Sequence, residues 1–176
     1  MTSTTADQRH TRFGALYEEY VPVVRAYVRT KVSSEDVEPV VLATFETAWS
    51  RLEVVPLLSE KSWLFGVARN HMRNLFRANR RRGNLVEAIT AARPKTTTEL
   101  YASDLDPADR DRLRHAFGQL SEVDREIVQL TVWHGLDSNE VALVLEISPA
   151  NVRVRLHRAR QKLATLLSAD SGEVAS

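Results

Sequence analysis

The chain has 176 residues, enough for one ordinary domain or two small ones, and its 43% hydrophobic content can supply packed cores without disulfide or metal staples. The absence of cysteine excludes disulfide frameworks, thiolate zinc sites and cysteine nucleophiles, and it fits a reducing compartment. The 24 Lys and Arg nearly balance the 23 Asp and Glu, so the distribution of charge is more informative than the net charge of +1. No apolar run approaches the roughly 18 residues of a membrane span, and the first ten residues are polar, so we expect a cytoplasmic protein without membrane insertion.

Apolar residues recur at spacings of three and four through most of the chain, and we find no convincing alternating strand. Residues 13–28 and 41–52 follow this period and predict two amphipathic helices. A third helix is expected to start near Ser59 or Ser62 and to run through the arginine-rich block that ends at residue 82. Together these elements predict an all-helical first domain at about residues 10–84.

The stretch 85–108 is acidic and contains two prolines and a run of three threonines, a composition typical of a flexible linker. A second group of helices is expected over residues 109–168. Its helix starts are indicated at Ser121, Asp137 and Ser148, which are good capping residues. The predicted fold class is therefore all-α, with two small helical domains joined by a flexible acidic linker.

Six arginines and no acid occupy residues 69–82. At about 100° per residue, Leu64, Ala68 and Met72 fall on one side of this helix, whereas Trp63 falls among the cationic residues. Such a face suits single-stranded nucleic acid, because a base can stack on the ring while arginines follow the phosphates. A solvated basic face, and a Trp63 that packs against the preceding loop, remain as alternatives. The candidate residues for the single strand are Trp63, Arg69, Asn70, Arg73, Asn74, Arg77 and Arg80.

The segment 137–163 has the layout of a helix-turn-helix, with a short helix, a tight turn at 146–148 and a longer second helix. The outer side of such a second helix reads base edges in the major groove. A helix that is merely charged is the alternative. Glu146 stands where this turn often holds glycine, so we expect a somewhat different or strained turn. The candidate base-reading residues are Asn151, Arg153, Val154, His157 and Arg158.

Catalytic and metal-binding patterns are missing from the sequence. The five histidines show no ligand spacing, and the six glycines form no phosphate-binding loop. We therefore expect neither an enzyme nor a bound cofactor or metal. His71, on the apolar side of its helix, is interpreted as a core histidine with a hydrogen-bond partner.

The chain resembles a bacterial RNA polymerase sigma factor of the extracytoplasmic-function (ECF) type. The resemblance lies in FGALYEEY at 13–20, ATFETAWSRL at 43–52, SWLFGVARNHMRNLFRANRRR at 62–82 and LSEVDREIVQLTVWHGLDSNEVALVLEISPANVRVRLHRARQKL at 120–163. It implies that domain 10–84 binds core RNA polymerase and melts the minus-10 element of promoter DNA, and that domain 109–168 reads the minus-35 element. It also implies that the loop 53–61 captures a flipped base, and that an anti-sigma factor or other regulator is a partner.

The sequence departs from this family just before TFETAW. The family usually has an acidic, glutamine-bearing surface there that meets a basic coiled coil of the polymerase, whereas residues 39–43 read PVVLA. Three interpretations stay open: neighbouring acids compensate, the factor is weakened, or phosphorylation restores roughly −1.5 to −2 charges. The candidate core-binding residues are Glu38, Pro39, Leu42, Ala43 and Glu46, and the candidate phosphorylation sites are Thr44, Thr47 and Ser50.

The sequence thus predicts a promoter-specificity subunit that directs core RNA polymerase to a restricted promoter set. Two rivals come from other classes of protein. One is a helix-turn-helix regulator that binds DNA without polymerase, and the other is a sigma-like interaction protein with weakened core binding. Dependence of DNA binding on polymerase distinguishes the first rival, and run-off transcription with purified core polymerase distinguishes the second.

Overall fold

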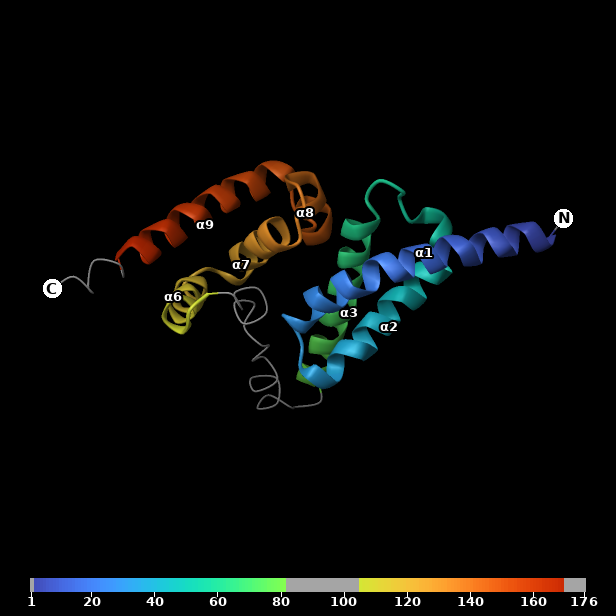
Figure 1. Cartoon of the computed structure of the whole chain (residues 1–176), viewed down its shortest axis with the longest axis horizontal. Coiled ribbons are helices and arrows are strands. Elements are labelled where there is room, and N and C mark those ends of the chain that lie inside the picture. Colours follow the sequence, from blue (N-terminus) through green and yellow to red (C-terminus); the bar gives the residue numbers. More distant parts are fainter. Residues whose placement is uncertain (1, 82–104, 170–176) are drawn as a thin grey trace. The chain divides into compact units, whose positions relative to one another are not determined.

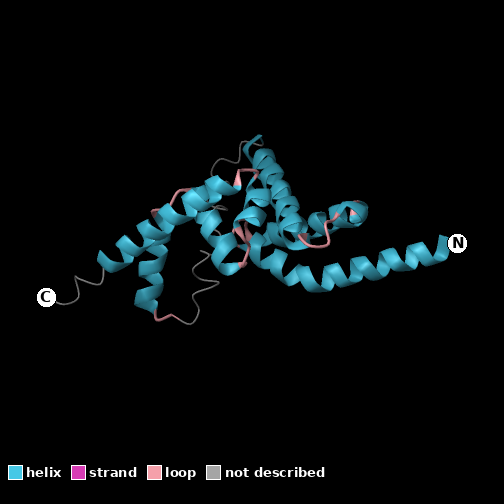
Figure 2. Ribbon diagram, turned by 90° about the horizontal axis from the view of Figure 1, so that it is seen from above, coloured by secondary structure: helices cyan, strands magenta, loops and turns pink. Residues whose placement is uncertain are grey.

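The computed structural model describes residues 2–81 and 105–169, and every regular element in these ranges is helical (Figure 1; Figure 2). The chain divides into two compact units, Met1–Pro94 and Lys95–Ser176. The predicted all-α fold is therefore confirmed for the described residues. Most of the predicted linker, 85–108, lies outside them.

Three helices and one short 3-10 helix form the described part of the first unit. They are α1 (Thr2–Arg29), α2 (Ser34–Ser50), the 3-10 helix η1 (Leu52–Val54) and α3 (Glu60–Arg81). Each of the three α-helices packs against the other two. Their apolar sides meet in the core, where Tyr27 stacks on Phe65 with ring centroids 4.6 Å apart and Phe45 is 2% exposed. The predicted amphipathic helices are thus held together by burial of their apolar stripes.

Helix α1 begins well before the expected domain start at residue 10. Its first turns are polar, so apolar periodicity could not predict them. Arg9, however, donates a hydrogen bond to the carbonyl of Trp49 at the end of α2, and Arg12 donates one to the carbonyl of Val55 just after η1. Tertiary contacts of these two side chains therefore attach the polar start of α1 to the domain.

Four α-helices and one π-helical segment form the described part of the second unit. They are α6 (Pro107–Gly118), α7 (Glu122–Val128), the π-helix η2 (Gln129–Trp133), α8 (Ser138–Leu145) and α9 (Pro149–Ala169). The predicted starts at Ser121, Asp137 and Ser148 are confirmed, because each side chain accepts a backbone N–H of the first helical turn. Asp137 also forms a full capping box with Glu140.

Two features of the second unit differ from expectation. Helix α6 begins at Pro107 rather than near Asp109, because the Asp106 carboxylate accepts the N–H of Asp109 at 2.9 Å and proline suits the first helical position. The π-helical segment between α7 and α8 was not predicted, since apolar spacing does not separate it from an α-helix. None of the described helices is both long and apolar enough to cross a membrane.

Candidate nucleic-acid and polymerase interfaces

The turn between α8 and α9 sets the direction of the second helix of the motif. Glu146 ends α8 in the left-handed conformation, with φ 58° and ψ 41°, and it is the one non-glycine residue with positive φ in the described part of the chain. The Ile147 N–H then donates to the carbonyl of Ala142 at 3.2 Å, and the Asn151 N–H donates to the Ser148 hydroxyl at 3.2 Å. The strain expected in this turn therefore lies at Glu146, because this residue adopts a left-handed conformation that favours glycine.

Helix α9 separates an inner stripe from an outer face. Val152, Leu156 and Ala159 are buried against the rest of the unit. The five candidate base-reading residues point the other way, and all of them are exposed: Asn151, Arg153, Val154, His157 and Arg158. The structure therefore gathers these side chains on one face of the helix, near its N-terminal half.

One arginine of α9, Arg155, forms an ion pair within the second unit. Arg155 donates from Nη1 to Asp124 Oδ1 of α7 at 2.8 Å, and the Asp124 side chain is 25% exposed. Burial alone would raise the pKa of Asp124, but hydrogen bonds from Ser121 and Arg155 outweigh it and lower that pKa. Lys162 further anchors the helix by donating to the carbonyl of Gln119. These contacts fix α9 against α6 and α7 while its outer face stays open.

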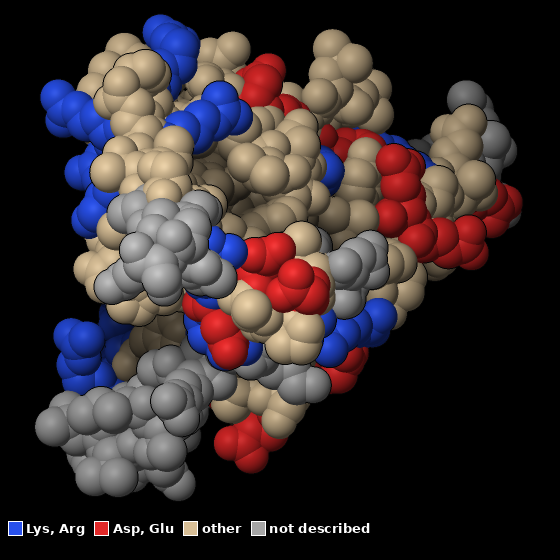
Figure 3. Space-filling view, turned by 60° about the vertical axis from the view of Figure 1, so that its left-hand side comes forward, with Lys and Arg blue, Asp and Glu red and all other residues tan. Residues whose placement is uncertain are grey.

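The basic face of α3 follows the predicted pattern. Leu64, Ala68 and Met72 are buried. Among the candidate strand-binding residues, Trp63 and Arg69 are half-buried, whereas the others are exposed: Asn70, Arg73, Asn74, Arg77 and Arg80. Asn74, Arg77, Arg80 and Arg81 line one hollow of the surface. Lys and Arg side chains protrude in clusters on the face drawn in Figure 3.

His71 has the partner that its position predicted. Its Nε2 lies 3.0 Å from the hydroxyl oxygen of Thr47 on α2. The ring is half-buried between α2 and α3 rather than fully enclosed. The contact is structural, and the described residues hold no group of acidic and histidine side chains that could bind a metal ion.

The loop between η1 and α3 has an apolar, exposed tip. Leu57 is 74% exposed and Leu58 is 97% exposed, whereas Val55 is buried with 2% exposure. The Ser59 N–H closes the tip as a turn by donating to the carbonyl of Pro56 at 3.1 Å. The two adjacent leucines form an exposed apolar patch, and contiguous exposed apolar patches mark interaction surfaces.

The outer face of α2 carries little free charge. Pro39 and Glu46 are exposed, Leu42 is 60% exposed, and Ala43 is half-buried. Glu38 accepts two hydrogen bonds from Arg25 of α1, at 2.7 and 3.1 Å, and this arginine lowers the pKa of Glu38. The carboxylate is therefore held ionised but is largely offset by the arginine.

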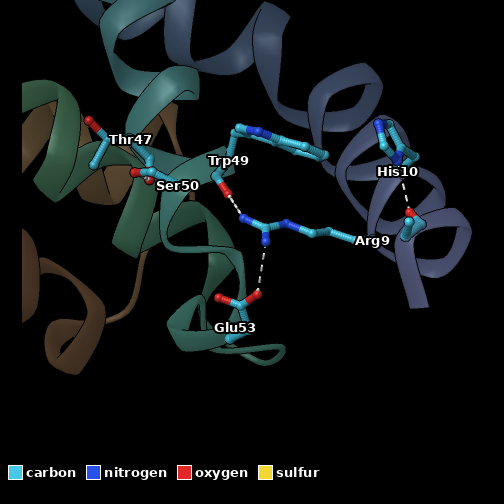
Figure 4. A network of polar contacts seen from close by, with 7 residues as sticks. Arg9, His10, Thr47, Trp49, Ser50 and Glu53 are labelled. Atoms are coloured by element: carbon cyan, nitrogen blue, oxygen red, sulfur yellow. Dashed lines mark hydrogen bonds and ion pairs between the residues drawn. The ribbon is translucent and has the colours of Figure 1, made fainter. Parts of the chain in front are cut away.

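The three candidate phosphorylation sites differ sharply in access. Thr44 is fully buried, and its hydroxyl donates to the carbonyl of Val40, so the structure does not support it as an acceptor. Thr47 is half-buried, and its hydroxyl donates to Ala43 in addition to its contact with His71. Ser50 is exposed at the end of α2 and is the most accessible of the three (Figure 4).

Comparisons with known proteins find a family match in the second unit and relatives similar over most of the chain. Residues 110–163 match the family described as sigma-70, region 4. The chain is 32% identical over 183 residues to RNA polymerase sigma factor CnrH of Cupriavidus metallidurans, which covers 97% of this chain and 94% of the relative. It is 30% identical over 158 residues to the ECF RNA polymerase sigma factor SigL of Mycobacterium tuberculosis, with 87% of each covered.

Solved structures show the same similarity. The structure of CnrH in complex with the cytosolic domain of CnrY aligns with a TM-score of 0.58 and 29% identity, over 90% of this chain and 88% of that one. The sigma factor RpoE in complex with the anti-sigma factor NepR from Bartonella quintana aligns with a TM-score of 0.61 and 21% identity, over 90% of this chain and 98% of that one. The second likeness concerns the fold alone.

The match of the helix-turn-helix unit to sigma-70, region 4 defines the chain as a DNA-binding transcription protein. More narrowly, the chain belongs to the RNA polymerase sigma factors of the ECF type. As a sigma factor it is a non-enzymatic subunit that directs core RNA polymerase to promoters. The predicted family and function are confirmed.

Proposed function

We propose that the second unit reads the minus-35 element as duplex DNA through the outer face of α9. The observation that carries this proposal is the separation of arginines on that helix: Arg155 is tied to Asp124, whereas Arg153 and Arg158 are exposed beside Asn151 and Val154. Arginine pairs bidentately with guanine, asparagine pairs with adenine, and valine can contact a thymine methyl. In this proposal, the domain that reads the minus-35 element comprises residues 109–168.

In the same proposal, the predicted first domain, residues 10–84, acts on the melted minus-10 element. Its arginines on α3 follow the phosphates of the unpaired strand, and the accessible part of the Trp63 ring stacks on a base. The exposed tip at Leu57 and Leu58 captures a flipped base. The outer face of α2 docks on core polymerase through Glu38, Pro39, Leu42, Ala43 and Glu46.

Regulation in the cytoplasm by an anti-sigma factor completes the proposal. The solved relatives CnrH and RpoE are each described in complex with another protein, CnrY and the anti-sigma factor NepR. By analogy, this chain is held inactive by such a partner until a signal releases it. The composition of the predicted linker, 85–108, whose last two residues belong to α6, suits a movement of the two domains when such a partner binds.

A second candidate, a factor with weakened core binding, is favoured by one observation. Residues 39–43 carry no charged side chain where the family usually has acidic ones. Glu38 does not compensate, because its carboxylate is paired with Arg25. Phosphorylation of Ser50, or less readily of Thr47, would return negative charge to the edge of this face.

Run-off transcription with purified core polymerase tests the proposal. Promoters are first selected from a randomised DNA library with the reconstituted holoenzyme, and each is then transcribed with the wild-type chain. We expect transcripts that depend on both promoter elements. Initiation that is insensitive to the minus-35 sequence would contradict the role of α9, and no transcripts with the unmodified chain would favour the weakened factor.

A further inference from the structure

Two arginines of α1 hold the loop that carries the exposed leucines. Arg9 donates from Nη2 to the carbonyl oxygen of Trp49 at 2.7 Å, and its Nη1 lies 3.3 Å from a carboxylate oxygen of Glu53 (Figure 4). The same guanidinium lies over the Trp49 ring, 4.8 Å from its centroid. Arg9 therefore contacts the end of α2 and the 3-10 helix η1 together.

Arg12 lies one turn further along α1 and contacts the far side of the loop. Its Nη2 donates to the carbonyl of Val55 at 2.8 Å, and the same atom lies 3.9 Å from Glu60, the first residue of α3. The Arg12 side chain is 33% exposed and that of Glu60 is 16% exposed, so this contact is partly shielded from water. The two arginines thus contact the loop at its start, its middle and its end.

Aromatic packing keeps this part of α1 in place. The Trp49 ring lies 5.0 Å from His10 and 5.1 Å from Phe13, centroid to centroid. The Val55 side chain is buried beneath the loop. The backbone of the loop is therefore fixed from α1, whereas Leu57 and Leu58 stand in solvent.

We propose that Arg9 and Arg12 are positioning residues for minus-10 recognition. They hold the backbone of residues 49–60 in the shape that presents Leu57 and Leu58 to the unpaired strand. A loop that is already ordered binds with a smaller loss of conformational entropy than a loop that must be ordered by the DNA. The inference rests on the proposed function of the loop, so its test must separate the loop from its support.

The test measures how well the holoenzyme discriminates single-stranded DNA. Holoenzyme is reconstituted with each variant, and its affinity is compared for a fluorescent oligonucleotide with a selected minus-10 element and for the same oligonucleotide with that element scrambled. We expect Arg9→Ala/Arg12→Ala to reduce this discrimination by about tenfold, the scale of losing one charge-assisted hydrogen bond. Affinity for core polymerase and for minus-35 duplex should remain within about twofold.

Three controls make the result specific. Arg29→Ala removes a positive charge from the exposed last turn of α1, far along the helix from the loop, and should leave discrimination unchanged. Arg9→Lys/Arg12→Lys keeps the charge and an ammonium donor at each position but loses the two-armed guanidinium, and it should restore part of the discrimination. Thermal unfolding by circular dichroism checks that each variant is folded.

The outcomes separate the two proposals. Unchanged discrimination in the double alanine variant, or an equal loss of core-polymerase affinity, would overturn the positioning role. Leu57→Ser/Leu58→Ser tests the loop itself. If this variant discriminates as the wild type does, the proposed base capture fails, whatever the arginine variants show.

Discussion

Arg153 and Arg155 lie two residues apart on the same helix, and the fold gives them opposite environments. Arg155 faces α7 and pairs with Asp124, whereas Arg153 is exposed on the outer face. Helical geometry explains the difference, because two residues advance about 200° around the axis. The number of arginines in a recognition helix is therefore a poor measure of its DNA contacts.

Substitution of Arg153 or Arg158 tests whether these exposed side chains read bases. We expect Arg153→Ala and Arg158→Ala each to cost about 1–3 kcal/mol of binding free energy and to relax preference at particular minus-35 positions. Arg160→Ala is the matched control, since Arg160 is exposed further along α9, where a phosphate contact is expected. Holoenzyme binding to single-base variants of the minus-35 duplex measures the effect. A uniform loss on every sequence would assign Arg153 or Arg158 to phosphate as well.

The pair of Asp124 and Arg155 predicts a pH-dependent contribution to the stability of the second unit. Because the folded state lowers the pKa of Asp124, the pair stabilises the fold above the unfolded pKa of about 3.9, and the contribution is lost as pH falls through the folded pKa. We expect Asp124→Asn to lower the melting temperature at pH 7 and to differ progressively less from the wild type towards pH 3. The free-energy difference at pH 7 should be up to about 1 kcal/mol. A difference that is constant over this range would contradict the assignment.

The turn of the helix-turn-helix stores a conformational cost at one residue. Left-handed φ and ψ cost an L-residue roughly 1–2 kcal/mol, and glycine avoids this cost but loses more backbone entropy on folding. We expect Glu146→Gly to raise the free energy of unfolding by about 1 kcal/mol, measured by thermal or denaturant unfolding. Glu146→Ala keeps the Cβ atom and should give no such gain. An equal gain from alanine would show that the glutamate side chain, rather than the backbone conformation, is responsible.

Helices with an apolar period and a capping residue could be predicted from the sequence. Ser121, Asp137 and Ser148 were identified because a cap needs only local neighbours. The start of α6 also has a local pattern, Asp106 followed by proline, which places it two residues before the expected start near Asp109. The polar start of α1 depends on contacts that Arg9 and Arg12 make across more than forty residues of sequence, and local patterns do not contain them.

In the candidate sites, too, features of a single helix could be predicted, whereas contacts between helices could not. Helical geometry separated the exposed and buried sides of α9, and it did so for most of α3, where Trp63 and Arg69 are half-buried rather than exposed. It did not reveal that Arg25 pairs with Glu38, because their contact joins two helices whose packing must be known first. The burial of Thr44 was likewise missed, since its position at the edge of the α2 face depends on how α1 and α3 cover that helix.

At the scale of the whole molecule, the proposed role of the α2 face is to bind core polymerase. We expect Ser50→Glu to strengthen core binding by at most about fivefold, because an exposed charge contributes up to about 1 kcal/mol and one carboxylate carries less charge than a phosphate. Ser50→Gln, of the same size but neutral, is the control. Fluorescence titration with purified core polymerase measures the affinity at low and high salt. Equal affinities of the two variants would argue against regulation by charge at this site.

The pairing of Arg25 with Glu38 also bears on how such a face can evolve. An acidic group is already present at the boundary with α1, and only its neighbour neutralises it. Replacement of that neighbour by an uncharged residue would unmask the anion without altering α2. The proposed docking face, which also carries the exposed Glu46, is therefore a single substitution away from one that is more negative, and the reverse change is equally short.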